Sequence, residues 1–223
     1  MRDFVAWILD WSEVWAVFIP LSVLLIKKNQ PKYLTPVIIY LVIALPLNLF
    51  ADIIWKFKTP YHFPDWLQTN TYLYNIHSII RFSLFSFFFI KLNQPFLVTI
   101  KKIIPVAFYL FVLVNFLFLQ YFFRYDRLSS RLLSVESALL LLYSLQYYYF
   151  KFQDESEITA RSSDFWVVTG LCIYCVGCFP IYLFYQTLLD QSENFTVNIW
   201  KVPDICYIIF CIFIAKGLSE AKS

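Results

Sequence analysis

Seven long apolar segments follow one another along this chain of 223 residues, separated by short polar connections. A helix needs about 20 residues to cross the hydrocarbon core of a bilayer, and each segment reaches roughly that length. Backbone polar groups in lipid must be satisfied within the protein, which favours helices for such segments. We therefore predict an all-α polytopic transmembrane bundle that forms a single domain over residues 1–223. The predicted spans are residues 4–26, 33–54, 71–91, 103–122, 131–150, 165–188 and 198–216.

Composition supports lipid rather than water as the main surroundings of the chain. Hydrophobic residues make up 60% of it and charged residues only 15%, too few to cover the surface of a soluble domain. The lipid bilayer is therefore the first predicted partner. The formal charge of +3 is small and dispersed, so no nucleic-acid partner is expected.

The first segment is the weakest of the seven. Asp10 and Glu13 interrupt it, and its uninterrupted apolar part runs only over residues 14–26. Aromatic residues share one helical face of the segment, which suits a helix half in the headgroup zone and half in the bundle. We predict seven membrane-spanning helices. The alternative is six spanning helices with a first segment that lies in the membrane interface.

Lysine and arginine predict the orientation in the membrane. Of the 18 such residues, seven lie at the N-terminus and in the second, fourth and sixth connections, and ten lie in the other connections and the tail. Arg81 is the remaining one, inside a span. Because cytoplasmic loops are enriched in positive residues, we predict the N-terminus outside and the C-terminus inside. The predicted location is a bacterial inner membrane.

The third segment carries polar residues at membrane depth. Tyr74, His77 and Arg81 follow Asn70 at spacings of four, three and four, which places them on one helix face. Arg81 comes ten residues after Thr71, about 15 Å along the helix and near the bilayer centre. An ionisable group there costs about 2.5–3.5 kcal/mol on insertion scales, so it needs a partner, water or a function.

Five carboxylates on other segments are candidate counter-charges for Arg81. With the predicted orientation all five fall in the outer half of the membrane, and two asparagines do the same. These residues are Asp10, Glu13, Asp52, Glu136, Asp204, Asn48 and Asn115. The simplest geometry is a polar crevice open to the outside, with Arg81 at its floor and the aromatic connection 55–70 near its mouth. A buried Arg81–Glu136 or Arg81–Asp204 pair that only fixes helix register is the structural alternative.

Other features predict neither a cofactor nor a metal. Cys172, Cys175 and Cys178 drift around a helix axis at third-residue spacing and cannot converge on an ion. No hydrolase, metalloprotease or nucleotide-binding motif occurs, so no catalytic residue is proposed. Gly170 and Gly177 share a face of the sixth segment and predict a seam of close packing with another helix or subunit.

Three stretches resemble a family of integral membrane proteins. Residues 70–77 (NTYLYNIH), 134–147 and 164–174 (DFWVVTGLCIY) are similar to seven-helix membrane proteins common in Bacteroidota, and loosely to the membrane modules that precede histidine kinases. The resemblance implies sensing. Only seven residues follow Lys216, so a sensor of this build is expected to act through a separate membrane or cytoplasmic partner protein.

The leading hypothesis is a receptor-like or regulatory membrane protein whose outer crevice around Arg81 binds a small anionic ligand or a membrane-embedded partner. One alternative is a membrane carrier, or the substrate-binding subunit of a transporter. Another is an intramembrane lipid-modifying enzyme, for which the sequence offers no recognisable nucleophile and base.

Overall fold

The computed structural model describes residues 7–61, 63–64, 67–92, 94, 98–119, 128–153, 162–191, 195 and 198–221. Its long helices are α2 (Ser12–Ile26), α3 (Thr35–Tyr61), α4 (Thr71–Lys91), α5 (Val98–Val114), α6 (Ser130–Gln153), α7 (Ser163–Gln191) and α9 (Lys201–Glu220). A short 3-10 helix, η1 (Lys32–Leu34), leads into α3, and a π-helical segment, η3 (Asn115–Leu119), follows α5. No strand occurs in this part of the chain, so the all-α prediction is confirmed for it.

Each predicted span overlaps one of these long helices. The first residues of span 4–26 and the last of span 103–122 lie outside the described residues. Five helical stretches are long and apolar enough to cross a membrane: Lys32–Lys58, Thr71–Lys91, Val98–Leu119, Ser163–Leu189 and Lys201–Glu220. The chain therefore has the helices of a multi-pass membrane protein.

The helices α2 and α6 fall short of that standard for different reasons. The 15 residues of α2 are apolar but extend only about 22 Å, less than the hydrocarbon thickness. The 24 residues of α6 are long enough, but their serines, tyrosines, glutamines and Glu136 make the helix less hydrophobic. The weakness expected near Asp10 and Glu13 is thus visible as a short helix.

The end of the second span differs from its prediction. Instead of ending at residue 54, α3 continues to Tyr61, so the first part of the expected 55–70 connection is helical. Lysines in this extension are held by aromatic rings: the nitrogen of Lys56 lies 3.9 Å from the ring centre of Trp11, and that of Lys58 lies 4.0 Å from Trp55. Cation–π contacts and interfacial aromatics stabilise a helix that projects past the apolar zone.

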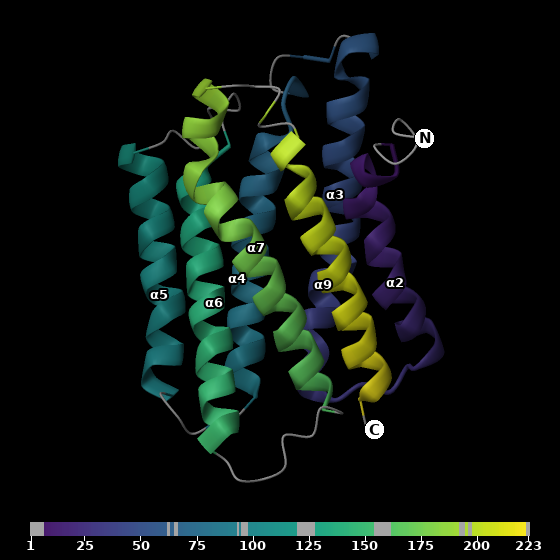
Figure 1. Ribbon diagram of the computed structural model, residues 1–223, viewed down its shortest axis with the longest axis vertical. Helices are drawn as coiled ribbons and strands as arrows, with labels where there is room; N and C mark the ends of the chain where they lie inside the picture. Colours follow the sequence, from purple (N-terminus) through teal and green to yellow (C-terminus); the bar gives the residue numbers. More distant parts are fainter. Residues whose placement is uncertain are drawn as a thin grey trace.

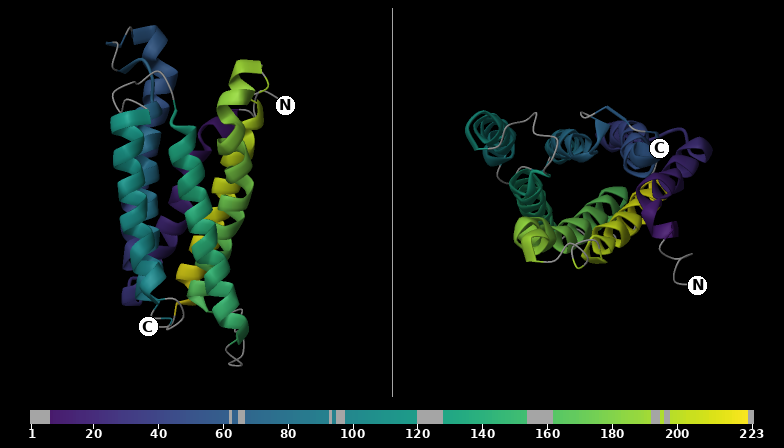
Figure 2. Two further views of the ribbon diagram at one scale, coloured as in Figure 1. Left: turned by 90° about the vertical axis from the view of Figure 1, so that its left-hand side faces the viewer. Right: turned by 90° about the horizontal axis from the view of Figure 1, so that it is seen from above.

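Six helices form a closed ring in which neighbours pack in the order α2, α3, α4, α6, α7, α9 and back to α2. The view from above in Figure 2 shows this arrangement. Outside the ring, α5 packs on α4 and α6. Only 11% of the most apolar part of Val98–Leu119, which comprises α5 and η3, is buried, against 44–50% for the other four candidate spans. Its outward side chains are therefore placed to face lipid.

Successive helices alternate in direction along the long axis of the bundle (Figure 1). At the upper end of that view α2, α4, α6 and α9 begin and α3 and α7 end. We call this the upper end and the opposite one the lower end. Hydrogen bonds from Lys27 to the carbonyl of Ser219 and from Gln30 to that of Leu218 tie α2 to α9 at the lower end.

Aromatic side chains fill the lower half of the ring. Phe85, Phe89, Tyr143 and Phe210 are essentially inaccessible to solvent. The rings of Phe89 and Tyr143 stack with 5.0 Å between their centres. Phe85 packs on Phe210 across the ring, 5.5 Å away. Stacked and tilted aromatic pairs make this half a dense apolar plug.

All three glycines of the chain lie between α7 and α9. A Cβ on Gly170 would come 2.5 Å from the Cβ of Phe213, and one on Gly177 would meet the sulfur of Cys206. A Cβ on Gly217 would lie 2.8 Å from the carbonyl oxygen of Ser163. The predicted close-packing seam is confirmed, with α9 of the same chain as its partner. Small residues allow two helix backbones to approach closely.

This seam predicts unequal costs for two matched substitutions. Gly170→Ala should destabilise the fold by about 1–3 kcal/mol, because the Cβ of Phe213 cannot move without its backbone. Gly177→Ala should cost less, since the sulfur of Cys206 can rotate away. Thermal unfolding of both purified variants in mild detergent measures the difference. Equal, negligible effects would contradict the close packing.

Candidate functional site

The centre of the ring holds a buried ion pair between α4 and α6. Arg81 Nε donates to Glu136 Oε1 at 2.5 Å, and Nη2 donates to Oε2 at 2.8 Å. Arg81 is 4% exposed and Glu136 0%. This two-pronged geometry is the strongest form of an arginine–carboxylate interaction. The sequence left Glu136 and Asp204 as alternative partners, and the structure pairs Arg81 with Glu136.

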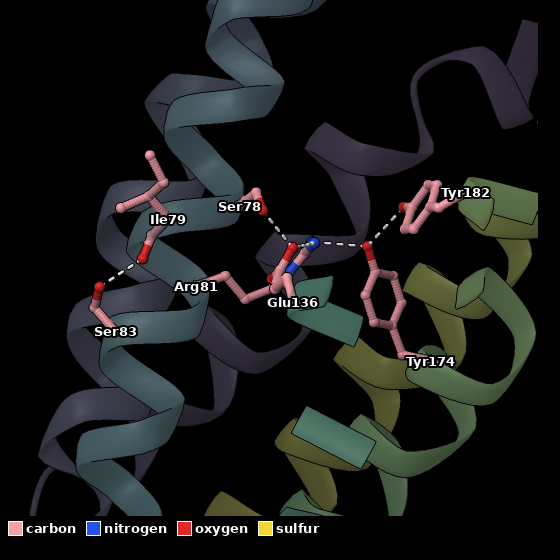
Figure 3. A network of polar contacts seen from close by, with 7 residues as sticks. All are labelled: Ser78, Ile79, Arg81, Ser83, Glu136, Tyr174 and Tyr182. Carbon is pink, nitrogen blue, oxygen red and sulfur yellow. Dashed lines mark hydrogen bonds and ion pairs between the residues drawn. The ribbon is translucent and has the colours of Figure 1, made fainter. Parts of the chain in front are cut away.

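Further polar groups complete the coordination of this pair (Figure 3). Ser78, one turn before Arg81 on α4, donates to Glu136 Oε2 at 2.6 Å. Arg81 Nη1 donates to the hydroxyl oxygen of Tyr174 on α7 at 2.7 Å. The Tyr174 hydroxyl lies 3.1 Å from that of Tyr182. The central network therefore joins α4, α6 and α7, and it leaves Arg81 with its charge balanced inside the protein.

A second polar cluster lies toward the upper end, between α2, α3, α4 and α9. Tyr74 donates its hydroxyl hydrogen to Glu13 Oε2 at 2.8 Å. Asn48 donates to the backbone oxygen of Glu13 at 2.7 Å and to the hydroxyl of Tyr207 at 3.2 Å. Asn70 ties the start of α4 to α3 by donating to the backbone oxygen of Ala51 at 3.1 Å. The predicted residues Tyr74 and Asn48 thus meet at Glu13.

Two more predicted carboxylates lie in the same region. Asp52 on α3 is 7% exposed, and Asp204 on α9 is 9% exposed. Both interact electrostatically with Glu13 and with each other. Asp52 Oδ2 is buried and has no hydrogen-bond partner among the residues that the structure describes. Carboxyl groups from three helices therefore gather above a central pair that is already neutral.

His77 and Asn115 belong to different surroundings. The His77 ring stacks on Tyr40 with 5.6 Å between ring centres, and its Nε2 has no hydrogen-bond partner in the described part of the chain. Asn115, at the start of the π-helical η3, donates to the hydroxyl of Ser129 at 3.3 Å, and the Ser129 amide donates to Asn75. These two hydrogen bonds connect η3, α4 and the residue before α6, and neither involves Arg81.

Sequence reasoning missed the tyrosines and the serine around the pair. Tyr174 and Tyr182 are eight residues apart, close to two helical turns, so they share a face of α7. Ser78 precedes Arg81 by three residues and shares its face. A search for phenolic and hydroxyl groups at helical spacing in otherwise apolar spans would have found all three.

The five cysteines are free. Within the described residues, no group of three or more histidine, cysteine, aspartate or glutamate side chains has an arrangement that could hold a metal ion. Comparisons of the chain with protein-family models, with curated proteins and with solved structures gave no match. The resemblance to Bacteroidota membrane proteins stays a prediction, and function must be argued from the residues themselves.

The buried pair predicts a large effect of a small change. Glu136→Gln keeps the shape of the side chain but leaves Arg81 buried without a counter-charge, which should destabilise the fold by about 3–5 kcal/mol. The control is Glu220→Gln, which breaks the partly exposed pair with Lys216 and should cost less than about 1 kcal/mol. Denaturant unfolding in detergent measures both. Similar costs would contradict the burial of the Arg81–Glu136 pair.

Proposed function

We propose that this chain is a receptor-like or regulatory protein of a bacterial inner membrane that acts through a partner protein. In this proposal seven helices span the bilayer, with the upper end outside and the lower end in the cytoplasm. The excess of lysine and arginine in the lower-end connections supports that orientation. The resemblance to sensor modules supports the receptor-like role.

The observation that carries the proposal is the division of the ring interior into two halves. Its upper half holds the partly exposed Glu13 and the buried Asp52 and Asp204, leading down to the Arg81–Glu136 pair. Its lower half is packed with aromatic rings. A polar interior that is blocked below suits ligand reception from outside better than passage through the bundle. A carrier would have to open the aromatic plug to let its substrate leave.

The packing of the ring helices also connects the ligand site at the upper end with the lower end. A ligand can shift a conformational equilibrium only by binding one state better than another. Its contacts at the upper end would lie on α2, α3 and α9, and α9 packs along α7 through the three glycines down to the lower end. A shift of α9 against α7 would therefore be felt on the cytoplasmic side, where a partner binds.

The balanced charge of Arg81 changes the ligand that the geometry favours. Both oxygens of Glu136 and the hydroxyl of Tyr174 already accept its hydrogen bonds. A small anionic ligand would compete with Glu136 for the charge of Arg81, and it would approach past other carboxyl groups. The predicted anionic ligand is therefore not the one that this site supports best.

Orientation can be tested by labelling with a membrane-impermeant maleimide. In a cysteine-free background, a cysteine in place of Gln68, at the upper end, should react in cells whose outer membrane is permeabilised. A cysteine in place of Lys28, at the lower end, should react only after the inner membrane is broken. The opposite pattern would place the upper end in the cytoplasm and contradict the proposal.

Partner dependence can be tested by photo-crosslinking in native membranes. A photoreactive phenylalanine replacing Phe152, which is 73% exposed near the lower end of α6, should give a discrete protein adduct. The control position is Phe118, which is 80% exposed near the upper end of η3 and should give none. Absence of any adduct from position 152, together with substrate uptake into proteoliposomes, would establish a carrier instead.

A further inference from the structure

Three carboxyl groups at the upper end of the ring lie within electrostatic range of one another and of Asp10. Glu13, Asp52 and Asp204 come from α2, α3 and α9, and none forms an ion pair with another residue that the structure describes. Asp52 and Asp204 are more than nine-tenths buried. Keeping several like charges out of water is costly unless an opposite charge joins them or protons neutralise them.

The nearest basic side chains are engaged elsewhere. Arg81 forms its ion pair with Glu136 and donates a further hydrogen bond to Tyr174. The nitrogen of Lys56 lies over the ring of Trp11, and Lys201 donates to the side-chain oxygen of Asn198 at 2.9 Å. Both lysines lower the local negative potential from a distance, without contacting a carboxylate. Among the described residues, no lysine or arginine forms an ion pair with these acids.

Aromatic rings border the same carboxylates. Trp200 directly precedes α9, one turn before Asp204, and its ring meets those of Tyr74, Tyr182 and Tyr185. The ring centres lie 6.2, 6.0 and 5.2 Å from that of Trp200. Trp200, Tyr74 and Tyr185 are only half-buried. The hydrogen bond from Tyr74 to Glu13 joins this aromatic group to the acids. Aromatic faces together with carboxylates are the chemistry that proteins use to bind ammonium groups.

The spacing of the acids favours an organic cation over a metal ion. Among the described residues, no three histidine, cysteine, aspartate or glutamate side chains are arranged so that they could hold one metal ion. A larger cation can contact carboxylates on separate helices while its alkyl groups touch aromatic rings. Asp52 Oδ2, buried and without a hydrogen-bond partner in the described part of the chain, is an acceptor ready for an N–H donor.

We propose that the upper end binds a small organic ammonium group between Glu13, Asp52 and Asp204, against the ring of Trp200. The inference deepens the proposed function and rests on it, because the site is reached from outside only in the proposed orientation. The ammonium can belong to a soluble amine or to the headgroup of phosphatidylethanolamine. Both sources supply the same positive charge and N–H donors.

The test is a thermal-shift titration of the full chain in detergent. Ethanolamine should raise the melting temperature in a saturable way, because a ligand that binds the folded state stabilises it, while potassium at equal ionic strength should not. Asp52→Asn and Asp204→Asn should each weaken the apparent affinity by about tenfold, the usual effect of losing a hydrogen bond to a charged group. Asp164→Asn at the lower end, where Asp164 bonds Tyr147 and Lys151, is the matched control and should keep wild-type affinity.

The same variants separate binding from folding. Asp52→Asn and Asp204→Asn remove like charges from a crowded region, so without amine they should melt at or above the wild-type temperature. Loss of stability in both would mean that the carboxylates serve the fold, and it would overturn the proposal. So would equal shifts with potassium and ethanolamine, or unchanged amine affinity in both variants.

Nanodiscs distinguish the two sources of the ammonium group. Stabilisation by phosphatidylethanolamine over phosphatidylglycerol that is lost in Asp204→Asn identifies the lipid headgroup, and an effect of soluble ethanolamine alone identifies a free amine. The crosslink from position 152 keeps the two proposals apart. An adduct without any amine effect overturns only the ligand class, and an amine effect without an adduct overturns only the partner-dependent function.

Discussion

The buried ion pair between Arg81 and Glu136 is the interaction on which the rest of this bundle depends. A guanidinium near the middle of a membrane cannot be left without a counter-charge, and the two-pronged contact satisfies it together with Ser78 and Tyr174. The contact requires α4, α6 and α7 to face one another across the ring. Helices in lipid lack the hydrophobic effect as a driving force for association, so such a contact selects their arrangement.

The remaining features of the ring follow from this constraint. Below the pair, aromatic side chains pack tightly, and the buried Lys101 lies on α5, outside the ring. At one side of the ring, α7 and α9 approach closely along the glycine seam. Above the pair, Glu13, Asp52 and Asp204 form no ion pair with another described residue, and this leaves a group of carboxyls at the upper end of the bundle. The proposed functions rest on that group.

Sequence patterns predicted the parts of this structure that depend on a single helix. The bounds of α4 agree with the predicted span 71–91, and the placement of Arg81 among buried polar residues follows from its spacing to Tyr74 and His77. The choice between Glu136 and Asp204 could not be made, because spacing along one helix does not say which other helix packs beside it. The same reason explains why Asn115 was grouped with Arg81 although it contacts Ser129. The extension of α3 was missed because an aromatic, lysine-containing stretch reads equally as an interfacial loop or as a helix end.

A double-mutant cycle on Arg81 and Glu136 measures directly whether this pair organises the bundle. The measured quantity is the free energy of unfolding in detergent for Arg81→Leu, Glu136→Leu and the double variant. We expect each single variant to be strongly destabilised and the double variant to be more stable than either, because two apolar side chains replace a buried pair without leaving a charge unpaired. Additive losses, with the double variant the least stable of the three, would contradict the claim that this pair organises the bundle.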